Sequence, residues 1–463
     1  MSRSGLSGLT IGGLVSLALV QPMLIPLDVG AVPACAPQIN RQLEGAALKG
    51  AHWGIVIQDL DSGQTLYQKN AHRLFVPAST LKLLTTATAL QLLGPDYRWQ
   101  TPLYLQGQGP NLEQLTLFAQ GDPTLTTAHL KAIAESLQTQ GIRRINRLTL
   151  ADPQPQKNPY PDSWEWGDLP YAYAPILSAA ILNENQVTLT VTPQELGQPL
   201  ALSWSDSLAL PVGYLDNQTR TVATNPQPLS LEPRWGKNPW LLRGSLSPDA
   251  PPVTLRLGVP EPHRYFLAVW QRELRNQGIE VEKTQLLPAL EPPPSIPWLT
   301  LISAPLKNVM ARINQDSHNL YAEALGRLWT PLEGQAFWHS LFPDLSLKVV
   351  DSSGLSRQNL LSPQFLVQLL AHMTHTPYAD IYKQSLAIAA QGGTLQNRFR
   401  DTVVAGKLWG KTGTLGGTAG LAGYMQINEQ KTRIVVILVN NSVLESRPLR
   451  QALDDIVLLA HQC

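Results

Sequence analysis

The chain has 463 residues, of which 43% are hydrophobic and 15% charged, with 35 basic against 34 acidic side chains. Its length predicts two or three folded units. The low charge excludes a disordered chain, and the even charge balance excludes a nucleic-acid-binding protein with a basic face. His372 and His375 lie near helical spacing but have no third ligand nearby, so no metal site is expected. No other cofactor is expected either.

Segment 1–34 is expected to be a signal peptide or a membrane anchor. Arg3 precedes a mostly apolar run over 6–27, and small residues follow at Gly30, Ala31 and Ala34. The run is close to the roughly 20 residues that cross a bilayer. Cleavage and retention as an anchor, with membrane association, therefore both stay open, and export is expected in either case.

Residues 52–95 are expected to form a hairpin and then a helix. Stretch 53–57 is apolar and β-branched, Asp61-Ser62-Gly63 is a turn sequence, and 65–67 form the returning strand. The following helix covers 80–93 and ends at Gly94-Pro95.

The composition changes between about 100 and 294, where prolines are frequent and short apolar runs such as 187–191 alternate. Tryptophans stand there at 164, 166, 204, 235 and 240. This pattern indicates inserted β-rich material with one late helix near 263–277, and three prolines at 292–294 mark its exit.

The remainder of the chain is expected to be helical over 304–329 and in several further helices up to about 390. Two strands follow at 421–428 and 432–440, and an amphipathic helix covers 447–462. Strands near both ends of the chain, each accompanied by a terminal helix, indicate one antiparallel sheet assembled from the two ends.

Ser79 and Lys82 are candidates for a nucleophile and its base. Three residues apart on a helix, they are neighbours on one face, and a serine hydroxyl attacks well only when an adjacent base takes its proton. A helix N-terminus also favours negative charge beside Ser79. Taken alone, the pair is more typical of a helix cap with a surface lysine.

Two further segments have the same ambiguity. Lys411, Thr412, Gly413 and Thr414 lie on an expected exposed strand whose glycine permits a close approach of another backbone. An extended peptide could pair there while the lysine and hydroxyls meet a carboxylate. Ser317-His318-Asn319 precedes a helical run, where helix capping is the ordinary interpretation.

The three segments together resemble the S-x-x-K, S-D-N and K-T-G set of penicillin-binding proteins and class A β-lactamases, in the same order. The surrounding residues are similar to the type 4, class C penicillin-binding proteins, the D-alanyl-D-alanine carboxypeptidase/endopeptidase family. The similarity rests on 77–82, 121–125, 317–323 and 351–357, and it extends over nearly all of the chain after segment 1–34.

The resemblance implies an α/β (α+β) penicillin-binding serine transferase fold, in which an antiparallel sheet is flanked by helices and β-rich domains are inserted. A peptidase domain would comprise 35–100 and 295–463. An inserted domain II would comprise 101–155 and 241–294, with a nested domain III at 156–240.

The resemblance also implies the chemistry of the site. Ser79 attacks, Lys82 is the base, Ser317 and Asn319 complete the proton network, and backbone N–H groups of Ser79 and Thr414 form the oxyanion hole. Lys411, Thr412, Gly413 and Thr414 bind the substrate carboxylate and line the pocket. Asp152 and Arg357 fall where family members bind the charged side chain of the stem peptide, although a structural salt bridge explains either of them equally well.

Two positions depart from the family pattern. His318 stands where the common motif has Asp, and Gly416 stands where some relatives have a polar side chain. The histidine is tolerable because the second residue of this motif usually points away from the site, although it could alter the pH dependence. The glycine leaves the stem-peptide specificity open.

The implied function is a penicillin-sensitive serine D-alanyl-D-alanine carboxypeptidase and/or endopeptidase in an exported, periplasmic or extracytoplasmic location. Its partners would be peptidoglycan stem peptides, with β-lactam antibiotics as inhibitors. A β-lactamase is disfavoured by the long insertion. A non-catalytic peptidoglycan-binding protein of the same fold is disfavoured because Ser79 and Lys82 are both present.

The two cysteines, Cys35 and Cys463, are expected to meet if the two terminal helices pack side by side. An exported protein retains disulfides. Two unpaired thiols, or a Cys35 that is lipidated or removed with the signal, are the alternatives.

Overall fold

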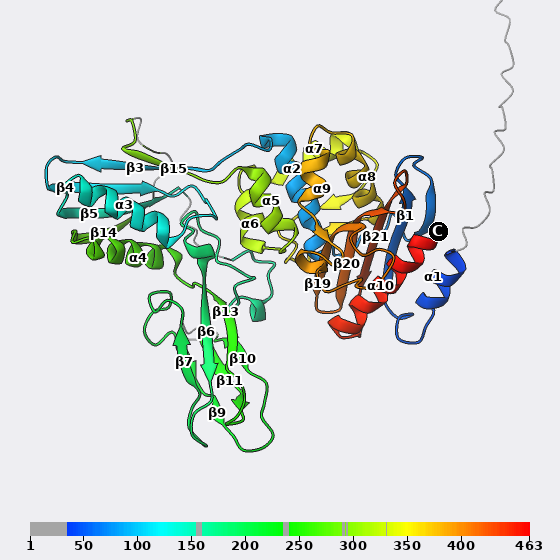
Figure 1. Ribbon diagram of the computed structural model, residues 1–463, viewed down its shortest axis with the longest axis horizontal. Helices are drawn as coiled ribbons and strands as arrows, with labels where there is room; N and C mark the ends of the chain where they lie inside the picture. The colour runs from blue at the N-terminus through cyan, green and yellow to red at the C-terminus, as the bar shows by residue number, and fades with distance from the viewer. Residues whose placement is uncertain (1–34, 154–159, 235–239, 289–291, 293–294, 330) are drawn as a thin grey trace, which may run out of the picture.

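The computed structural model describes residues 35–153, 160–234, 240–288, 292, 295–329 and 331–463. The predicted signal or anchor segment, 1–34, lies outside these residues. Figure 1 shows a helix-covered sheet that contains both ends of the described chain, a second sheet with two helices, and a smaller β-rich unit. Among the described residues, no helix combines the length and the apolarity that a membrane crossing requires.

The central sheet has six strands in the order β18-β19-β20-β21-β1-β2, and every neighbouring pair is antiparallel. Its N-terminal strands are β1 (His52–Asp59) and β2 (Thr65–Lys69). The others are β18 (Ala387–Ile388), β19 (Leu408–Leu415), β20 (Thr418–Gln426) and β21 (Thr432–Asn440). The prediction of one antiparallel sheet from both chain ends is confirmed.

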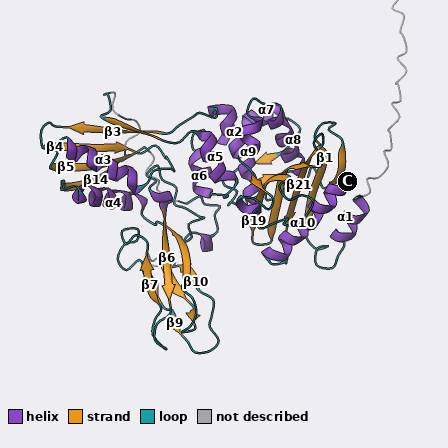
Figure 2. Cartoon of the chain, viewed as in Figure 1, coloured by secondary structure: helices purple, strands orange, loops and turns teal. Residues whose placement is uncertain are grey.

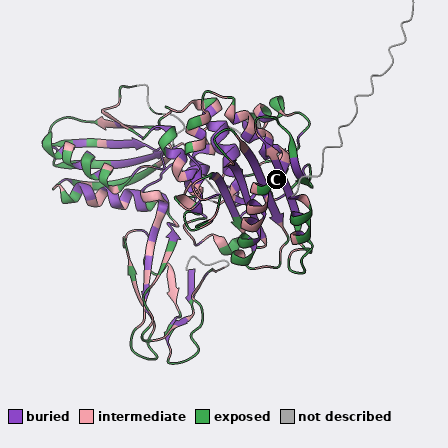
Figure 3. Ribbon diagram, turned by 45° about the vertical axis from the view of Figure 1, so that its right-hand side comes forward, coloured by how far each residue is buried: buried purple, intermediate pink, exposed green. Residues whose placement is uncertain are grey.

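Helices cover both faces of this sheet (Figures 2 and 3). Strands β20 and β21 are therefore buried along nearly their whole length. On one face Val56, Val436 and Leu438 pack under the main helical layer. That layer consists of α2 (Lys82–Leu93), α5 (Leu306–Asn314), α6 (Asn319–Gly326), α7 (Pro331–Leu341), α8 (Pro363–Thr374) and α9 (Ala379–Gln384).

On the opposite face Ile55 and Ile57, which alternate with Val56 along β1, pack under α1 (Ala36–Leu43) and α10 (Ser446–Gln462). Cys35 and Cys463 form a disulfide across the ends of these two helices, with Cα atoms 5.0 Å apart. The predicted pairing of the two cysteines is confirmed.

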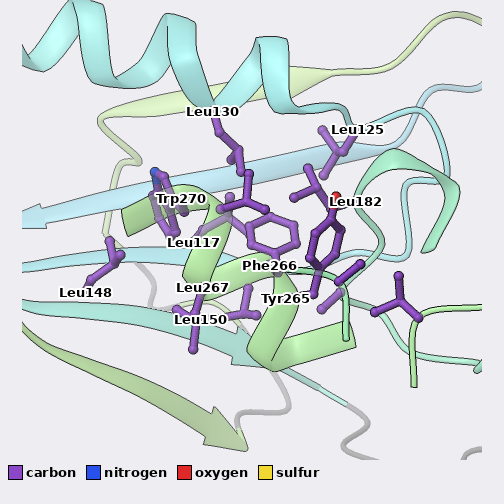
Figure 4. Close-up of a cluster of buried hydrophobic side chains, with 14 of the residues drawn as sticks. Leu117, Leu125, Leu130, Leu148, Leu150, Leu182, Tyr265, Phe266, Leu267 and Trp270 are labelled. Atoms are coloured by element: carbon purple, nitrogen blue, oxygen red, sulfur yellow. The ribbon is translucent and has the colours of Figure 1, made fainter. Parts of the chain in front are cut away.

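The second sheet has the order β14-β5-β4-β3-β15. Its strands are β3 (Gln100–Gln106), β4 (Asn111–Phe118), β5 (Arg144–Asp152), β14 (Glu280–Pro288) and β15 (Leu299–Ile302). Helices α3 (Thr127–Thr139) and α4 (Pro262–Asn276) pack on it, and Phe266 and Trp270 of α4 join Leu117, Leu148 and Leu150 of the strands in its core (Figure 4).

The smaller unit contains three short sheets. One is β13-β6-β7, with β6 (Gln186–Thr192), β7 (Ala201–Trp204) and β13 (Val253–Gly258). The others are β10 (Ser230–Pro233), β11 (Trp240–Arg243) and β8 (Leu215–Asn217), and the pair β12 (Ser245–Leu246) and β9 (Arg220–Thr221).

These pairings differ from the predicted domain division at two places. β12, β13 and most of β11 fall in the range assigned to domain II but pair with β9, β6 and β10 of the nested unit. β15 falls in the range assigned to the peptidase domain but pairs with β3 of the second sheet. A division drawn along the sheets would therefore extend the nested unit to about 258 and domain II to about 302.

Candidate active site

Ser79 and Lys82 stand where a short 3₁₀ turn, Ala78–Leu81, leads into α2. Ser79 is half-buried, whereas Lys82 is fully buried. The Lys82 Nζ donates to Ser79 Oγ at 2.9 Å, to Asn319 Oδ1 at 2.6 Å and to the carbonyl of Ser353 at 2.5 Å. The amine thus contacts the hydroxyl and an acceptor from the second motif at once.

The third motif brings a second buried amine to the site. Lys411 is fully buried on β19, and its Nζ donates to Ser317 Oγ and to the Thr412 carbonyl, both at 2.8 Å. The Thr412 hydroxyl donates to Thr394 Oγ1 at 2.7 Å. Thr394 lies outside the three motifs and was not predicted from the sequence.

Burial sets the proton affinities of both lysines. It lowers the pKa of Lys82 to about 7, against the opposing effect of the Asp351 and Glu323 carboxylates. Burial and the neighbouring charge of Lys82 hold the pKa of Lys411 well below its usual range. Burial is therefore the main cause of the low pKa of Lys82, and the neighbouring carboxylates act in the opposite direction.

The turn around Ser79 is fixed by two glycines that allow close backbone contact. Gly354 has φ +81°, and a Cβ there would lie 1.9 Å from the Ala78 carbonyl oxygen. A Cβ on Gly413 would lie 3.0 Å from the backbone nitrogen of Ser79. Ala78 and Ser317 themselves have φ of 48° and 62°, a region that non-glycine residues rarely adopt and that clusters at functional sites.

Two buried carboxylates hold the loop that supplies the Ser353 carbonyl. Glu323 Oε1 accepts from the backbone nitrogens of Ser352 and Ser353, at 3.1 and 2.8 Å. Asp351 Oδ1 accepts from the Gly354 nitrogen at 2.8 Å. Burial and the charge of Asp351 raise the pKa of Glu323 to about 7. From the sequence, neither residue was assigned a role beyond its place in the family similarity. The available signal for Glu323 was its position one helical turn after Asn319.

The motif residues open onto a cleft of about 860 Å³, lined in part by Ser79, Ser317, Thr394, Thr412, Gly413 and Thr414. A cleft of this volume accommodates a ligand larger than a single amino acid. Within the residues that the structure describes, no group of three or more His, Cys, Asp or Glu side chains could hold a metal ion.

Asp152 and Arg357 are not among the residues that line this cleft. Asp152 is buried at the end of β5, where its Oδ2 pairs with His263 Nε2 at 2.5 Å and accepts from Ser178 Oγ at 3.2 Å. Arg357 pairs with Glu165 and donates to the Gly416 carbonyl at 3.0 Å, just past β19. Their roles in substrate binding stay predictions.

His318 is turned towards the insertion. Its Nε2 lies 3.0 Å from Glu184 Oε2, and its ring contacts Tyr321 edge-on. Burial opposes ionisation of Glu184, but the hydrogen bonds and charges of His318 and Arg312 prevail and lower the pKa of Glu184 to about 2. The histidine at this position therefore contacts a carboxylate of the insertion that also pairs with Arg312.

Comparison with known proteins gives consistent matches over most of the chain. The model of the D-Ala-D-Ala carboxypeptidase 3 (S13) family matches residues 35–463. A D-alanyl-D-alanine carboxypeptidase of Actinomadura sp. (strain R39) is 30% identical over 481 aligned residues, covering 93% of this chain and 88% of that protein. The crystal structure of penicillin binding protein 4 from Haemophilus influenzae is 22% identical, with a TM-score of 0.78, and covers 91% of this chain and 98% of that one.

Proposed function

This chain belongs to the D-Ala-D-Ala carboxypeptidase 3 (S13) family, and we propose that it hydrolyses the D-alanyl-D-alanine bond of peptidoglycan stem peptides through an acyl-enzyme on Ser79. The observation that carries the assignment is the fully buried Lys82 amine, 2.9 Å from Ser79 Oγ, with a pKa of about 7. Half of the lysine is then a neutral base near neutral pH, which an ordinary lysine is not.

Acylation begins when Ser79 Oγ attacks the carbonyl carbon of the penultimate D-alanine and Lys82 accepts the hydroxyl proton. The backbone N–H groups of Ser79 and Thr414 stabilise the oxyanion. The C–N bond then breaks, and protonated Lys82 returns the proton to the departing amine, while Asn319 Oδ1 accepts from Lys82 and Lys411 donates to Ser317 Oγ. Free D-alanine leaves, and the remaining peptide is an ester of Ser79.

Deacylation repeats these steps with water as nucleophile. Lys82 takes a proton from the water, the ester breaks, and the proton returns to Ser79 Oγ.

Lys411, Thr412 and Thr414 bind the carboxylate of the leaving residue, and that carboxylate favours the protonated form of Lys411. A β-lactam forms the same ester by opening its ring, so it blocks Ser79.

We assign the enzyme to a compartment outside the cytoplasm, with segment 1–34 as its export signal. The Cys35–Cys463 disulfide supports this location, because disulfides persist in oxidising compartments and are rare in the cytosol. The substrate class supports it as well, since peptidoglycan lies outside the cytoplasmic membrane.

Labelling with a fluorescent penicillin, followed by mass mapping of the modified peptide, tests the assignment. We expect the label on Ser79, and we expect Ser79→Ala to lose labelling and D-alanine release by several orders of magnitude. Ser340→Ala, at an exposed serine on α7, is the matched control and should retain both. Label on another serine, or D-alanine release that survives Ser79→Ala, would contradict the mechanism.

A further inference from the structure

One wall of the catalytic cleft is rich in arginine. Arg398, Arg400, Arg447 and Arg450, called here the arginine wall, line the same cleft as Ser79 and Thr414. Among the described residues that line the cleft, a single carboxylate, Asp454, accompanies them. Because the whole chain is almost neutral, with 35 basic against 34 acidic residues, this is a local concentration of positive charge.

Only part of this charge is neutralised within the protein. Arg398 is paired with Asp454, both side chains being 13% exposed, so this pair is structural. Arg400 donates to uncharged acceptors on Asn397 and Gln396. Within the described part of the chain, Arg400, Arg447 and Arg450 form no ion pair, and Arg450 acts on Asp454 only electrostatically. All three are exposed.

The arginine wall shares its cleft with residues proposed to bind the leaving half of the substrate. The carboxylate of the leaving residue is assigned to Lys411, Thr412 and Thr414, and the two threonines line the same cleft as the wall. The Thr412–Thr394 hydrogen bond joins β19 to the segment that continues into Arg398 and Arg400. Arg357, a candidate for binding the acyl half, does not line this cleft and contacts Gly416, just past the end of β19.

We propose that the arginine wall is a second anion subsite, which binds a carboxylate carried by the leaving peptide beyond its first residue. D-Alanine has one carboxylate, which the threonines and Lys411 already bind, so it leaves the wall unused. Cleavage of a cross-link between two stem peptides instead releases an amine that is part of the second stem peptide, and that peptide carries further carboxylates. Planar guanidinium groups suit such carboxylates because they bind them bidentately. The inference rests on the proposed function and adds a preference for anionic, cross-linked leaving groups.

Two synthetic peptides with the same acyl half test this preference. Their leaving residue is D-2-aminopimelate or its side-chain amide, which differ only in the distal charge. We expect kcat/KM to favour the free acid roughly fivefold at low ionic strength, the effect of an exposed ion pair of about 1 kcal/mol. Added salt should bring the ratio towards one. The double variant Arg400→Gln/Arg447→Gln should also bring it close to one.

Arg143→Gln, at an exposed arginine on the second sheet's unit, is the control and should keep the native ratio. A ratio near one in the native enzyme, or equal losses on both substrates in the double variant, would overturn the inference. Release of D-alanine from a third peptide separates the two hypotheses. If the native enzyme releases D-alanine but shows no charge preference, only the inference fails; if it releases neither leaving group, the proposed function fails with it.

Discussion

Acylation of Ser79 should follow the protonation state of Lys82, and replacing Lys82 by arginine tests this dependence directly. Arginine retains a positive charge and hydrogen-bond donors, but it cannot act as a base near neutral pH. If charge were sufficient, the variant would keep much of its activity. If basicity is required, the variant should be nearly inactive.

The expected size of the effect follows from the burial of Lys82. With its pKa lowered to about 7, about half of Lys82 is neutral at pH 7, whereas at the ordinary value of 10.5 only about one molecule in 3,000 would be. Arginine, with a pKa above 12, would be neutral in fewer than about one molecule in 100,000. We therefore expect Lys82→Arg to lose at least about 10⁴-fold in the acylation rate, and Lys49→Arg, at an exposed lysine, to lose nothing.

The assay is the second-order rate of penicillin acylation measured from pH 5.5 to 9.5. The neutral amine is the active form, so the rate should rise with pH through a limb near 7 and then level off. Glu323 also has a pKa of about 7, so Glu323→Gln is needed to assign the limb. Because the Glu323 carboxylate raises the pKa of Lys82, the limb should persist in this variant and move to lower pH. A limb above pH 9, its disappearance in Glu323→Gln, or an arginine variant within tenfold of native would refute the reasoning.

Two further predictions concern the backbone around the site and the chain ends. Gly354→Ala places a Cβ against the Ala78 carbonyl and should slow acylation by about 100-fold, because Ser79 is displaced. Gly141→Ala is the control and should acylate normally, because Gly141 has the same φ of +81° but open space around it. Equal acylation rates in the two variants would contradict the packing argument. Cys463→Ser opens a loop with a sequence separation of 428 and should lower the free energy of unfolding by at most about 6 kcal/mol in denaturant titrations. The native protein in reductant is the matched comparison. An unchanged unfolding midpoint in both would refute a stabilising role of the disulfide.

Local hydrophobic patterns predicted the C-terminal strand and helix of the peptidase domain well. The strand predicted at 432–440 coincides with β21, and the helix predicted at 447–462 lies within α10. Both are strongly patterned, buried on one or two faces, and bounded by turn residues. The helix predicted at 80–93 is preceded by a 3₁₀ turn over Ala78–Leu81, which periodicity does not distinguish because four residues are too few to show a helical period.

The insertion was predicted less accurately, because its strands pair over long sequence separations. β13 returns to β6 after sixty residues that contain β7 to β12, and the composition of β13 does not distinguish the two neighbouring sheets. The same reason applies to the site residues that were missed. Glu323 and Thr394 act through contacts with Ser353 and Thr412, which are distant in sequence and become neighbours only in the fold.

The insertion also helps to orient the catalytic groups. Asn319 Nδ2 donates to the backbone carbonyl of Tyr173 at 2.6 Å, and this contact turns Oδ1 towards the Lys82 amine. Trp164 Nε1 donates at 3.0 Å to Asp351, whose other oxygen holds Gly354 against the turn of Ser79. Tyr173 and Trp164 both precede β6, within the range predicted as the nested domain. The acceptor that faces Lys82 and the loop that fixes Ser79 are therefore each positioned partly from outside the peptidase domain, so a peptidase domain without the insertion would lack two of the contacts that orient its own base and nucleophile.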